Sequence, residues 1–373
     1  MTYQEIIRPL LIRLDSETWH DYARETLHLA EKSSFTLKVL ELLLAYHHRR
    51  YTHEKLHIVL GGVSFDNPLM VGAGWDKAGR AVKSLYTLGF SGVEVGSVLA
   101  FQQPGNPKPR QFIIGPGVAL NHLGFNSPGV KQVAANLAKY ENNGIPIGVN
   151  IGKNRNTPDR QAPAEYAVVA GVLYQYADYF VINVSSPNTP GLRRLQDREP
   201  LTDIVQAVNS KMIELGGPKP LFVKIAPDLT EEAANDVIRV VADHNLSGIV
   251  ATNTTIDVRI KAKYGNKWRN REGGLSGDDP DFREMATTKI SHIWRETKGQ
   301  IEIIGVGGVK DAVTALEKIK SGAKVIQIVT GLVGEGPALP GKINRELVAH
   351  MNKRGIKSIN DLVGSRFSNK TTV

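Results

Sequence analysis

The chain of 373 residues contains no cysteine. This absence excludes disulfide bonds, thiolate metal sites, iron–sulfur ligation and a cysteine nucleophile or base. The N-terminal region also lacks the apolar core of about 7–15 residues that marks a secretory signal peptide. No window reaches the roughly 18 uninterrupted apolar residues of a membrane-spanning helix. We therefore expect no signal peptide and no spanning helix, and a chemistry that rests on oxygen and nitrogen side chains.

Basic residues outnumber acidic ones, with 46 Lys and Arg against 37 Asp and Glu, which gives a formal charge of +9. Such an excess favours anionic ligands, phosphate groups or an anionic surface. It also serves plain solubility, so the charge alone does not decide between these roles. The length suits one large domain with an accessory segment.

Residues 1–56 differ from the rest of the chain and predict a helical extension. Apolar residues recur at helical spacing over residues 6–14, and a second helix, with its cap at its start, is expected over residues 15–29. An apolar stretch over residues 35–46 then ends in the basic residues 47–50. An apolar helix face with a basic end suits a membrane interface. An ordinary helix packed onto its own domain is the alternative.

Eight short apolar runs of β type follow, with helical stretches between most of them. A hairpin signal around Gly61–Gly62 precedes them. The alternation predicts a (β/α)8 TIM barrel over residues 57–373. A doubly wound sheet is the alternative, but Gly72–Lys77 lacks the third glycine of its fingerprint. The eight runs are residues 69–74, 93–98, 148–152, 179–184, 221–226, 248–253, 301–307 and 325–330.

Polar residues stand at the ends of these runs, and the carboxyl ends of barrel strands carry chemistry. The clearest case is Asn183–Gly191, which places Asn, Ser and Thr side chains directly after an apolar run. Lys224 is another, because a charge in the barrel interior is costly unless it meets an anion; a lysine that points outward is the alternative. The polar or glycine strand ends are Lys77, Ser97, Asn150, Asn183, Lys224, Thr252, Asn253, Gly307, Gly308 and Thr330.

Glycines follow the last two runs, at Gly307–Gly308 and at Gly331. Such loops let backbone N–H groups approach a phosphate, and barrels commonly bind phosphate after strands seven and eight; a tight turn is the alternative. The glycine-rich stretch 273–277, which follows the sixth run, would add backbone donors. Together with a buried lysine these features suit flavin mononucleotide (FMN). His53–His57 matches a zinc motif only as a string, because its second histidine opens a β run, so no metal site is expected.

Eight motifs, taken in order along the chain, resemble those of the dihydroorotate dehydrogenases, in the membrane-associated class that uses quinone. The helical N-terminal extension is itself a mark of that class. The resemblance implies oxidation of dihydroorotate to orotate in pyrimidine biosynthesis, with FMN as hydride acceptor and a membrane quinone as final oxidant. The motifs are Gly72–Lys77, Asn121–Asn126, Gly148–Gly152, Asn183–Arg193, Lys224, Thr252–Thr255, Gly273–Gly277 and Gly305–Val309.

The resemblance also implies which residues bind the flavin and the substrate. Asparagines and a lysine around one ligand suit a pyrimidine with imide groups and a carboxylate, which needs paired donors and acceptors and one cation. The residues implied for FMN are Ala73, Gly74, Lys77, Ser97, Asn121, Asn150, Asn183, Lys224, Thr252, Gly277, Gly307, Gly308, Val329 and Thr330. Those implied for the substrate are Lys77, Asn121, His122, Leu123, Gly124, Phe125, Asn183, Asn188, Asn253 and Thr254.

Ser186 falls on the position of the catalytic base in this family. It would take a proton from C5 of dihydroorotate while C6 delivers hydride to the flavin. Serine is a weak base, so a relay through Thr189 and a water shielded by Phe125 is expected. The soluble classes use cysteine here, which this chain lacks. At the quinone head-group site, many members of the class have Arg and Tyr where this chain has Ile113 and Val329, so that site is expected to be more apolar.

The N-terminal helices would form the quinone entrance and associate with the membrane surface, which predicts a peripheral protein on the cytoplasmic side of the cell membrane. A monomer without a nucleic-acid partner is expected. Dihydrouridine synthases share the flavin barrel and would use the positive charge on RNA, but they need a cysteine acid and a C-terminal helical domain. A flavin-binding membrane-surface protein without catalysis is the other alternative, against which Lys77, Ser186 and Asn188 all argue.

Overall fold

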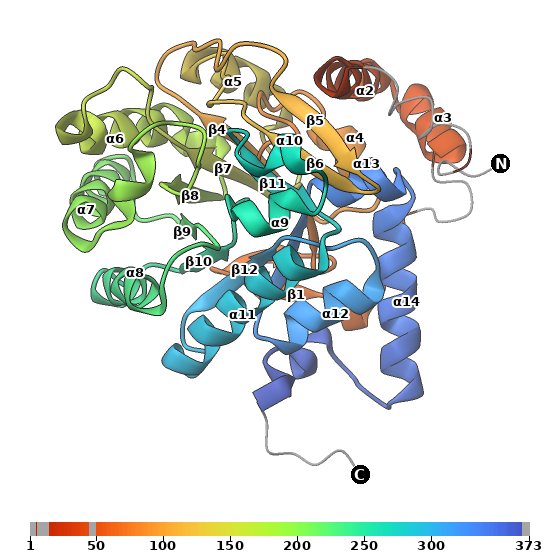
Figure 1. Cartoon of the computed structure of the whole chain (residues 1–373). Coiled ribbons are helices and arrows are strands. Elements are labelled where there is room, and N and C mark those ends of the chain that lie inside the picture. Colours follow the sequence, from red (N-terminus) through yellow and green to blue (C-terminus); the bar gives the residue numbers. More distant parts are fainter. Residues whose placement is uncertain (1–4, 6–14, 45–49, 368–373) are drawn as a thin grey trace.

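The computed structural model describes residue 5 and residues 15–44 and 50–367. Its centre is a closed barrel of eight parallel strands in the order β10-β12-β13-β3-β4-β7-β8-β9 (Figure 1). The predicted barrel is therefore confirmed, and a doubly wound sheet is excluded because the sheet has no free edge. The strands are β3 (Leu69–Val71), β4 (Val93–Val98), β7 (Ile147–Ile151), β8 (Tyr179–Asn183), β9 (Leu221–Ile225), β10 (Gly248–Ala251), β12 (Glu302–Val306) and β13 (Val325–Ile328).

Helices surround the barrel and bury its outer face, which explains why its strands are apolar on both faces. Local sequence signals set several helix starts: Thr230 caps α8, and Asp311 forms a capping box with Thr314 at α12. The helices after the N-terminal pair are α4 (Val82–Thr87), α5 (Val130–Leu137), α6 (Ala162–Leu173), α7 (Arg198–Glu214), α8 (Glu231–Asp243), α9 (Val258–Ala262), α10 (Asn266–Arg269), α11 (Pro280–Thr297), α12 (Ala312–Lys320), α13 (Thr330–Glu335) and α14 (Leu339–Lys353).

Two small antiparallel sheets accompany the barrel. The predicted hairpin is confirmed as β1 (Ile58–Leu60) and β2 (Val63–Phe65). The second sheet, β5 (Gln111–Gly115), β6 (Val118–Asn121) and β11 (Gly274–Gly277), contributes residues to the barrel mouth. The glycine-rich stretch 273–277 is for the most part strand β11, in which Leu275 pairs with Leu120 across the sheet.

The described part of the N-terminal extension forms α2 (Ser16–Ala30) and α3 (Ser34–Leu44), which lie together beside α4 and β5 (Figure 1). Asp15 caps α2 as predicted, and its carboxylate accepts the N–H of Thr18 at 2.8 Å. The helix expected over residues 6–14 and most of the basic residues at 47–50 lie outside the described residues.

The two N-terminal helices carry apolar side chains on their exposed faces as well as on their buried ones. Leu27 and Leu40 join the main hydrophobic core, so the pair is docked on the barrel. Other apolar side chains of α2 and α3 are exposed to solvent: Tyr22, Leu29, Phe35 and Leu42. Among the described residues, no helix combines the length and apolar character that crossing a bilayer requires.

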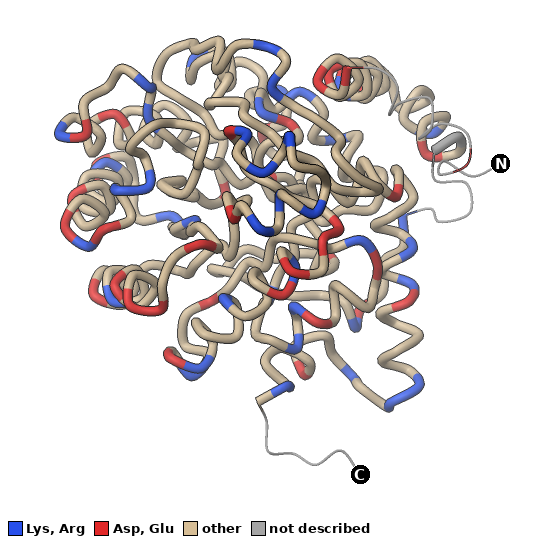
Figure 2. The backbone as a smooth tube through the Cα atoms, in the orientation of Figure 1, with Lys and Arg blue, Asp and Glu red and all other residues tan. Residues whose placement is uncertain are grey.

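Charged residues are interspersed over the outer helices, with basic and acidic side chains side by side in the view of Figure 2. Several are paired at helix surfaces, as Arg239 is with Asp236 at 2.6 Å. Pairs of this exposed kind contribute little to stability. The basic excess therefore does not by itself identify a binding face.

Candidate active site

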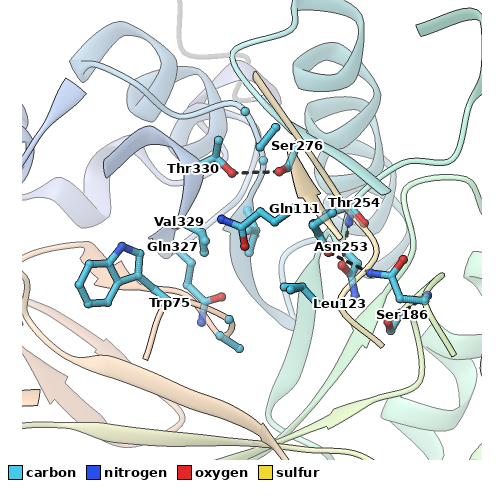
Figure 3. A pocket seen from close by; sticks show the side chains of 18 of the residues that line it. Trp75, Gln111, Leu123, Ser186, Asn253, Thr254, Ser276, Gln327, Val329 and Thr330 are labelled. Carbon is cyan, nitrogen blue, oxygen red and sulfur yellow. Dashed lines mark hydrogen bonds between the residues drawn. The ribbon is translucent and has the colours of Figure 1, made fainter. Parts of the chain in front are cut away.

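A cavity opens at the carboxyl ends of the barrel strands, where the polar strand ends of the sequence converge (Figure 3). Seven of the eight barrel strands, or the loops that follow them, contribute to its lining. The predicted site residues that line it are Ala73, Gly74, Lys77, Ser97, Asn121, Leu123, Gly124, Phe125, Asn183, Ser186, Asn188, Lys224, Thr252, Asn253, Thr254, Gly277, Gly307, Gly308, Val329 and Thr330.

Three predicted residues lie outside this lining. Asn150 lies behind it and accepts a hydrogen bond from Asn183 at 3.0 Å. The side chain of His122 pairs with Glu272 at 3.2 Å. The hydroxyl of Thr189 is buried and has no hydrogen-bond partner among the described residues.

Amide and hydroxyl side chains from neighbouring strands form one hydrogen-bonded cluster. Asn183 Nδ2 donates to Ser97 Oγ at 2.8 Å, while Asn183 Oδ1 accepts from Ser185 Oγ at 3.0 Å. Asn253 Nδ2 in turn donates to Ser185 Oγ at 3.0 Å. Ser185 is thus a positioning residue that joins the loop after β8 to the loop after β10, and it was not among the predicted site residues. The cluster holds the amide side chains in fixed orientations.

Ser186 lies in the loop after β8 and is 6% exposed. Its Oγ accepts the backbone N–H of Asn188 at 3.3 Å, which leaves the hydroxyl proton free. Phe125 lines the same cavity in a left-handed conformation (φ 53°). Gln103 Nε2 holds this conformation by donating to the carbonyl of Phe125 at 3.2 Å. Strained positions of this kind cluster at functional sites.

Two lysines line the cavity, Lys224 buried and Lys77 partly buried. Lys224 is 5% exposed and has no hydrogen-bond partner among the described residues; burial lowers its pKa, and Glu94 opposes that shift. Lys77 Nζ donates to Asn126 Oδ1 at 2.8 Å, and burial lowers its pKa to about 8. An ammonium withdrawn from water without a carboxylate partner is costly, so both groups fit a site that receives an anionic or electron-rich ligand.

The inward-facing side chains of the barrel form a polar network that the sequence analysis missed. Glu94 on β4 is completely buried and accepts from Asn150 Nδ2 at 2.9 Å. Its other oxygen accepts from Gln327 and from the hydroxyl of Tyr179. Glu94 interrupts an apolar run of the sequence, as Lys224 does, so it could have been recognised as a candidate site residue in the same way. The network supports the cavity, because Asn150 and Gln327 connect Glu94 to lining residues.

Backbone N–H groups gather at the other end of the cavity. Within the part of the chain that the structure describes, no hydrogen bond uses the N–H of Gly307 or Gly308, which follow β12. Helix α13 begins at Thr330, whose Oγ1 lies 2.9 Å from Ser276 Oγ on β11 (Figure 3). Free N–H groups beside a helix start and two hydroxyls suit a phosphate.

The donor and acceptor set fits a flavin. Three buried oxygens of the lining have no partner among the described residues: Asn188 Oδ1, Thr254 Oγ1 and Gln327 Oε1. A side chain at Gly74 would meet nothing within 4 Å, so the backbone there leaves open room beside the cavity. Orphaned oxygens, two cations and free N–H groups match a ring system with imide groups joined to a phosphate.

One arm of the cavity reaches α2 and is mostly apolar. Ile113, Ala119 and Val329 line it, together with His20 and Gln111. Burial lowers the pKa of His20 to about 3, so its ring is neutral and donates from Nε2 to the carbonyl of Trp75 at 2.7 Å. Gln111 projects into the cavity beside Val329 (Figure 3), and its Nε2 donates to the carbonyl of Ser16 at 3.4 Å. Neither polar residue was predicted.

Comparison with known proteins identifies the family to which the chain is similar. The family model described as dihydroorotate dehydrogenase matches residues 55–351. A protein named "Dihydroorotate dehydrogenase (quinone)" from Chloroflexus aurantiacus is 42% identical over 357 residues, which cover 93% of this chain and 96% of that protein. A protein of the same name from Gloeobacter violaceus is 40% identical over 370 residues, 99% of this chain and 100% of that protein.

Solved structures agree with these relatives. The chain is similar to the crystal structure of DHODH in complex with ferulenol from Eimeria tenella, with a TM-score of 0.84 and 30% identity. The match covers 95% of this chain and 96% of that one. A ligand-free structure of the Eimeria tenella protein gives a TM-score of 0.79 at 32% identity, over 90% of this chain and 99% of that one.

Proposed function

The chain belongs to the dihydroorotate dehydrogenase family of oxidoreductases, and from this premise we propose that it oxidises dihydroorotate to orotate with FMN and passes the electrons to a quinone. Membership of the family implies a flavin cofactor; FMN is the specific form that we propose. The observation that carries the proposal is the convergence of Lys77, Ser186 and the asparagine side chains on one cavity that also has room for a phosphate.

The residues divide into two groups by chemistry. Lys224, Gln327 and Thr252 would face the polar edge of the flavin ring, and Gly307, Gly308 and Thr330 its phosphate. The other group is suited to the substrate: Asn121, Asn188 and Asn253 for the ring donors and acceptors, and Lys77 for the carboxylate. Asn188 Nδ2 donates to Asn121 Oδ1 at 2.9 Å, so two of these amides orient each other.

When bound, a flavin supplies a hydride acceptor. The chain's own residues would supply the rest. Ser186 Oγ would take the C5 proton of dihydroorotate while C6 loses its hydride, which leaves the C5–C6 double bond of orotate. The free hydroxyl of Thr189 is placed in the same loop to pass that proton on through a water. Phe125 would exclude bulk water from the reacting face.

The proposal is tested by adding dihydroorotate to the purified flavin-loaded protein without oxygen. We expect the visible absorbance of the flavin to bleach promptly, because the substrate itself supplies both electrons. Orotate should appear in equal amount. A protein that keeps its yellow colour would overturn the substrate assignment while leaving the barrel and the cofactor site in place.

For the oxidant we propose the apolar arm beside α2. A quinone ring is apolar with two carbonyl acceptors, and the arm offers apolar walls plus the amide of Gln111. The exposed apolar side chains on α2 and α3, among them Phe35 and Leu42, support a peripheral position on a membrane. We propose the cytoplasmic face of the cell membrane, where a lipid-soluble oxidant is available.

Gln111→Met should raise the quinone concentration needed for half-maximal turnover about fivefold, because one neutral hydrogen bond to a carbonyl is lost. Flavin reduction by dihydroorotate should stay unchanged. Steady-state assays with a short-chain benzoquinone measure the quinone dependence of turnover, and anaerobic reduction measures the reaction with dihydroorotate alone. Together they separate the two half-reactions. Gln206→Met, at an exposed position on α7, is the matched control. Equal quinone dependence in both variants would exclude Gln111 from the oxidant site.

A further inference from the structure

The guanidinium of Arg193 connects three loops that surround the cavity. Arg193 lies in the short 3-10 helix Leu192–Gln196 that follows the loop after β8. Its Nε donates to the carbonyl of Ser185 at 3.0 Å, and its second nitrogen donates to Asp228 at 2.9 Å. The third nitrogen donates to the carbonyl of Thr254 at 3.0 Å. One side chain therefore joins the loops after β8, β9 and β10.

Both carbonyls belong to peptide bonds next to cavity residues. The carbonyl of Ser185 is part of the peptide bond whose nitrogen belongs to Ser186, and Thr254 follows Asn253 directly. Ser186, Asn253 and Thr254 all line the cavity. The length of the guanidinium thus sets the separation between the proposed base and the side chains proposed to hold the substrate ring.

The partner of Arg193 is fixed as well. Asp228 accepts the hydroxyl of Thr255 at 2.5 Å and the N–H of Ile256 at 3.2 Å. The side chains of Arg193 and Asp228 are only 22% and 19% exposed. Asp228 is therefore a shared acceptor for Arg193 and for the loop after β10, and neither ion can turn away without leaving the other unpaired in a largely buried site.

The backbone of Arg193 is held in addition to its side chain. Gln196 Nε2 donates to the carbonyl of Arg193 at 3.1 Å, and Gln196 Oε1 accepts the N–H of Ala226 at 3.0 Å. Ala226 directly follows β9, and Asp228 lies two residues further on. The backbone and the side chain of Arg193 are therefore both anchored to the segment after β9. Three nitrogens in a planar fork fit this task, whereas the single nitrogen of a lysine does not reach three acceptors in different directions.

We propose that Arg193, with Asp228, is a positioning pair that holds Ser186 at reacting distance from the substrate. Neither residue touches the reacting atoms; both act through the backbone on either side of the substrate. This inference rests on the proposed function, because it takes Ser186 as the base. It goes further by naming the device that aligns the base with the substrate-binding amides.

The test is Arg193→Lys, which keeps the positive charge and removes the fork. We expect the limiting rate of flavin reduction by dihydroorotate to fall about 100-fold, since a misplacement of about 1 Å costs that much in reactions that depend on alignment. The dissociation constant for dihydroorotate, taken from the concentration dependence of the same rate, should change little. Stopped-flow absorbance without oxygen measures both values.

Arg194→Lys is the matched control. Arg194 is the next residue, its side chain is 76% exposed, and among the described residues its guanidinium contacts the carboxylate of Asp159 at 3.4 Å and no other side chain. Its reduction kinetics should equal those of the unmodified protein. Flavin content and the unfolding temperature, measured for both variants, separate a positioning role from general loss of structure.

If Arg193→Lys does not yield folded protein, Asp228→Asn provides the second variant, because it keeps the shape of the acceptor and removes its charge. It should show the same split between rate and affinity. An unchanged limiting rate in the folded variant overturns the inference. A slower rate that is fully explained by a lower flavin content overturns it as well. If the unmodified protein is not reduced by dihydroorotate, the proposed function fails, which is a separate result.

Discussion

Ser186→Ala should retain bound flavin and lose its reduction by dihydroorotate, with a rate about 10²–10⁴-fold lower, the usual contribution of a positioned base. The hydroxyl of Ser186 has no acceptor among the described residues, and its only hydrogen bond is the N–H that it accepts from Asn188. Removing it therefore costs the scaffold little. Anaerobic stopped-flow absorbance measures the rate, and the flavin spectrum measures occupancy.

Ser291→Ala provides the control for this variant. Ser291 is also a buried serine, its hydroxyl has no partner among the described residues, and it lies on α11 away from the cavity lining. Its reduction rate should match that of the unmodified protein. Near-normal reduction in Ser186→Ala would assign the base to another group, with Thr189 as the next residue to change.

The barrel could be predicted because its period is visible in the sequence. Each parallel strand is buried on both faces and appears as an apolar run, and each run carries a polar residue or glycine within its last three positions. The cavity then follows, because the carboxyl ends of parallel strands meet at one end of the barrel. The motif resemblance to dihydroorotate dehydrogenases, based on the same strand ends, is confirmed by the family match.

Long-range pairing could not be predicted in the same way. Leu120 pairs with Leu275 in a sheet whose strands are far apart along the chain, and glycine-rich residues 273–277 carry the composition of a loop. Contacts with the neighbouring strand decide the conformation of that segment, and amino-acid composition does not reveal those contacts. The position of residue 56 as a domain boundary stays a prediction, since Leu27 of α2 packs into the same core as the barrel.

Charged residues inside the barrel explain another gap in the sequence analysis. Glu94 and Lys224 both break an apolar run, yet only the lysine was weighed as functional. Glu94 matters because it accepts from Asn150, Gln327 and Tyr179 at once. A rule that treats every buried charge in a strand as a site signal would have found both.

Lys224→Met should lower the reduction potential of the bound flavin. A unit charge about 4 Å from a developing negative charge contributes about 4 kcal/mol at an effective dielectric constant of about 20. For a two-electron couple this corresponds to a shift on the order of 90 mV, because about 30 mV equals 1.4 kcal/mol. Redox titration against a reference dye measures the shift, and flavin retention on gel filtration should fall as well.

The buried lysine on α12 gives this experiment its control. Lys318 is buried, as Lys224 is, and burial lowers its pKa to about 7, yet its Nζ donates to Thr287 and it does not line the cavity. Lys318→Met removes a buried ammonium of the same kind and should leave the flavin potential unchanged. Equal potentials in both variants would mean that Lys224 does not face the flavin ring. A lower reduction potential in Lys224→Met alone would show that the ammonium of Lys224 stabilises the negative charge that the flavin gains on reduction.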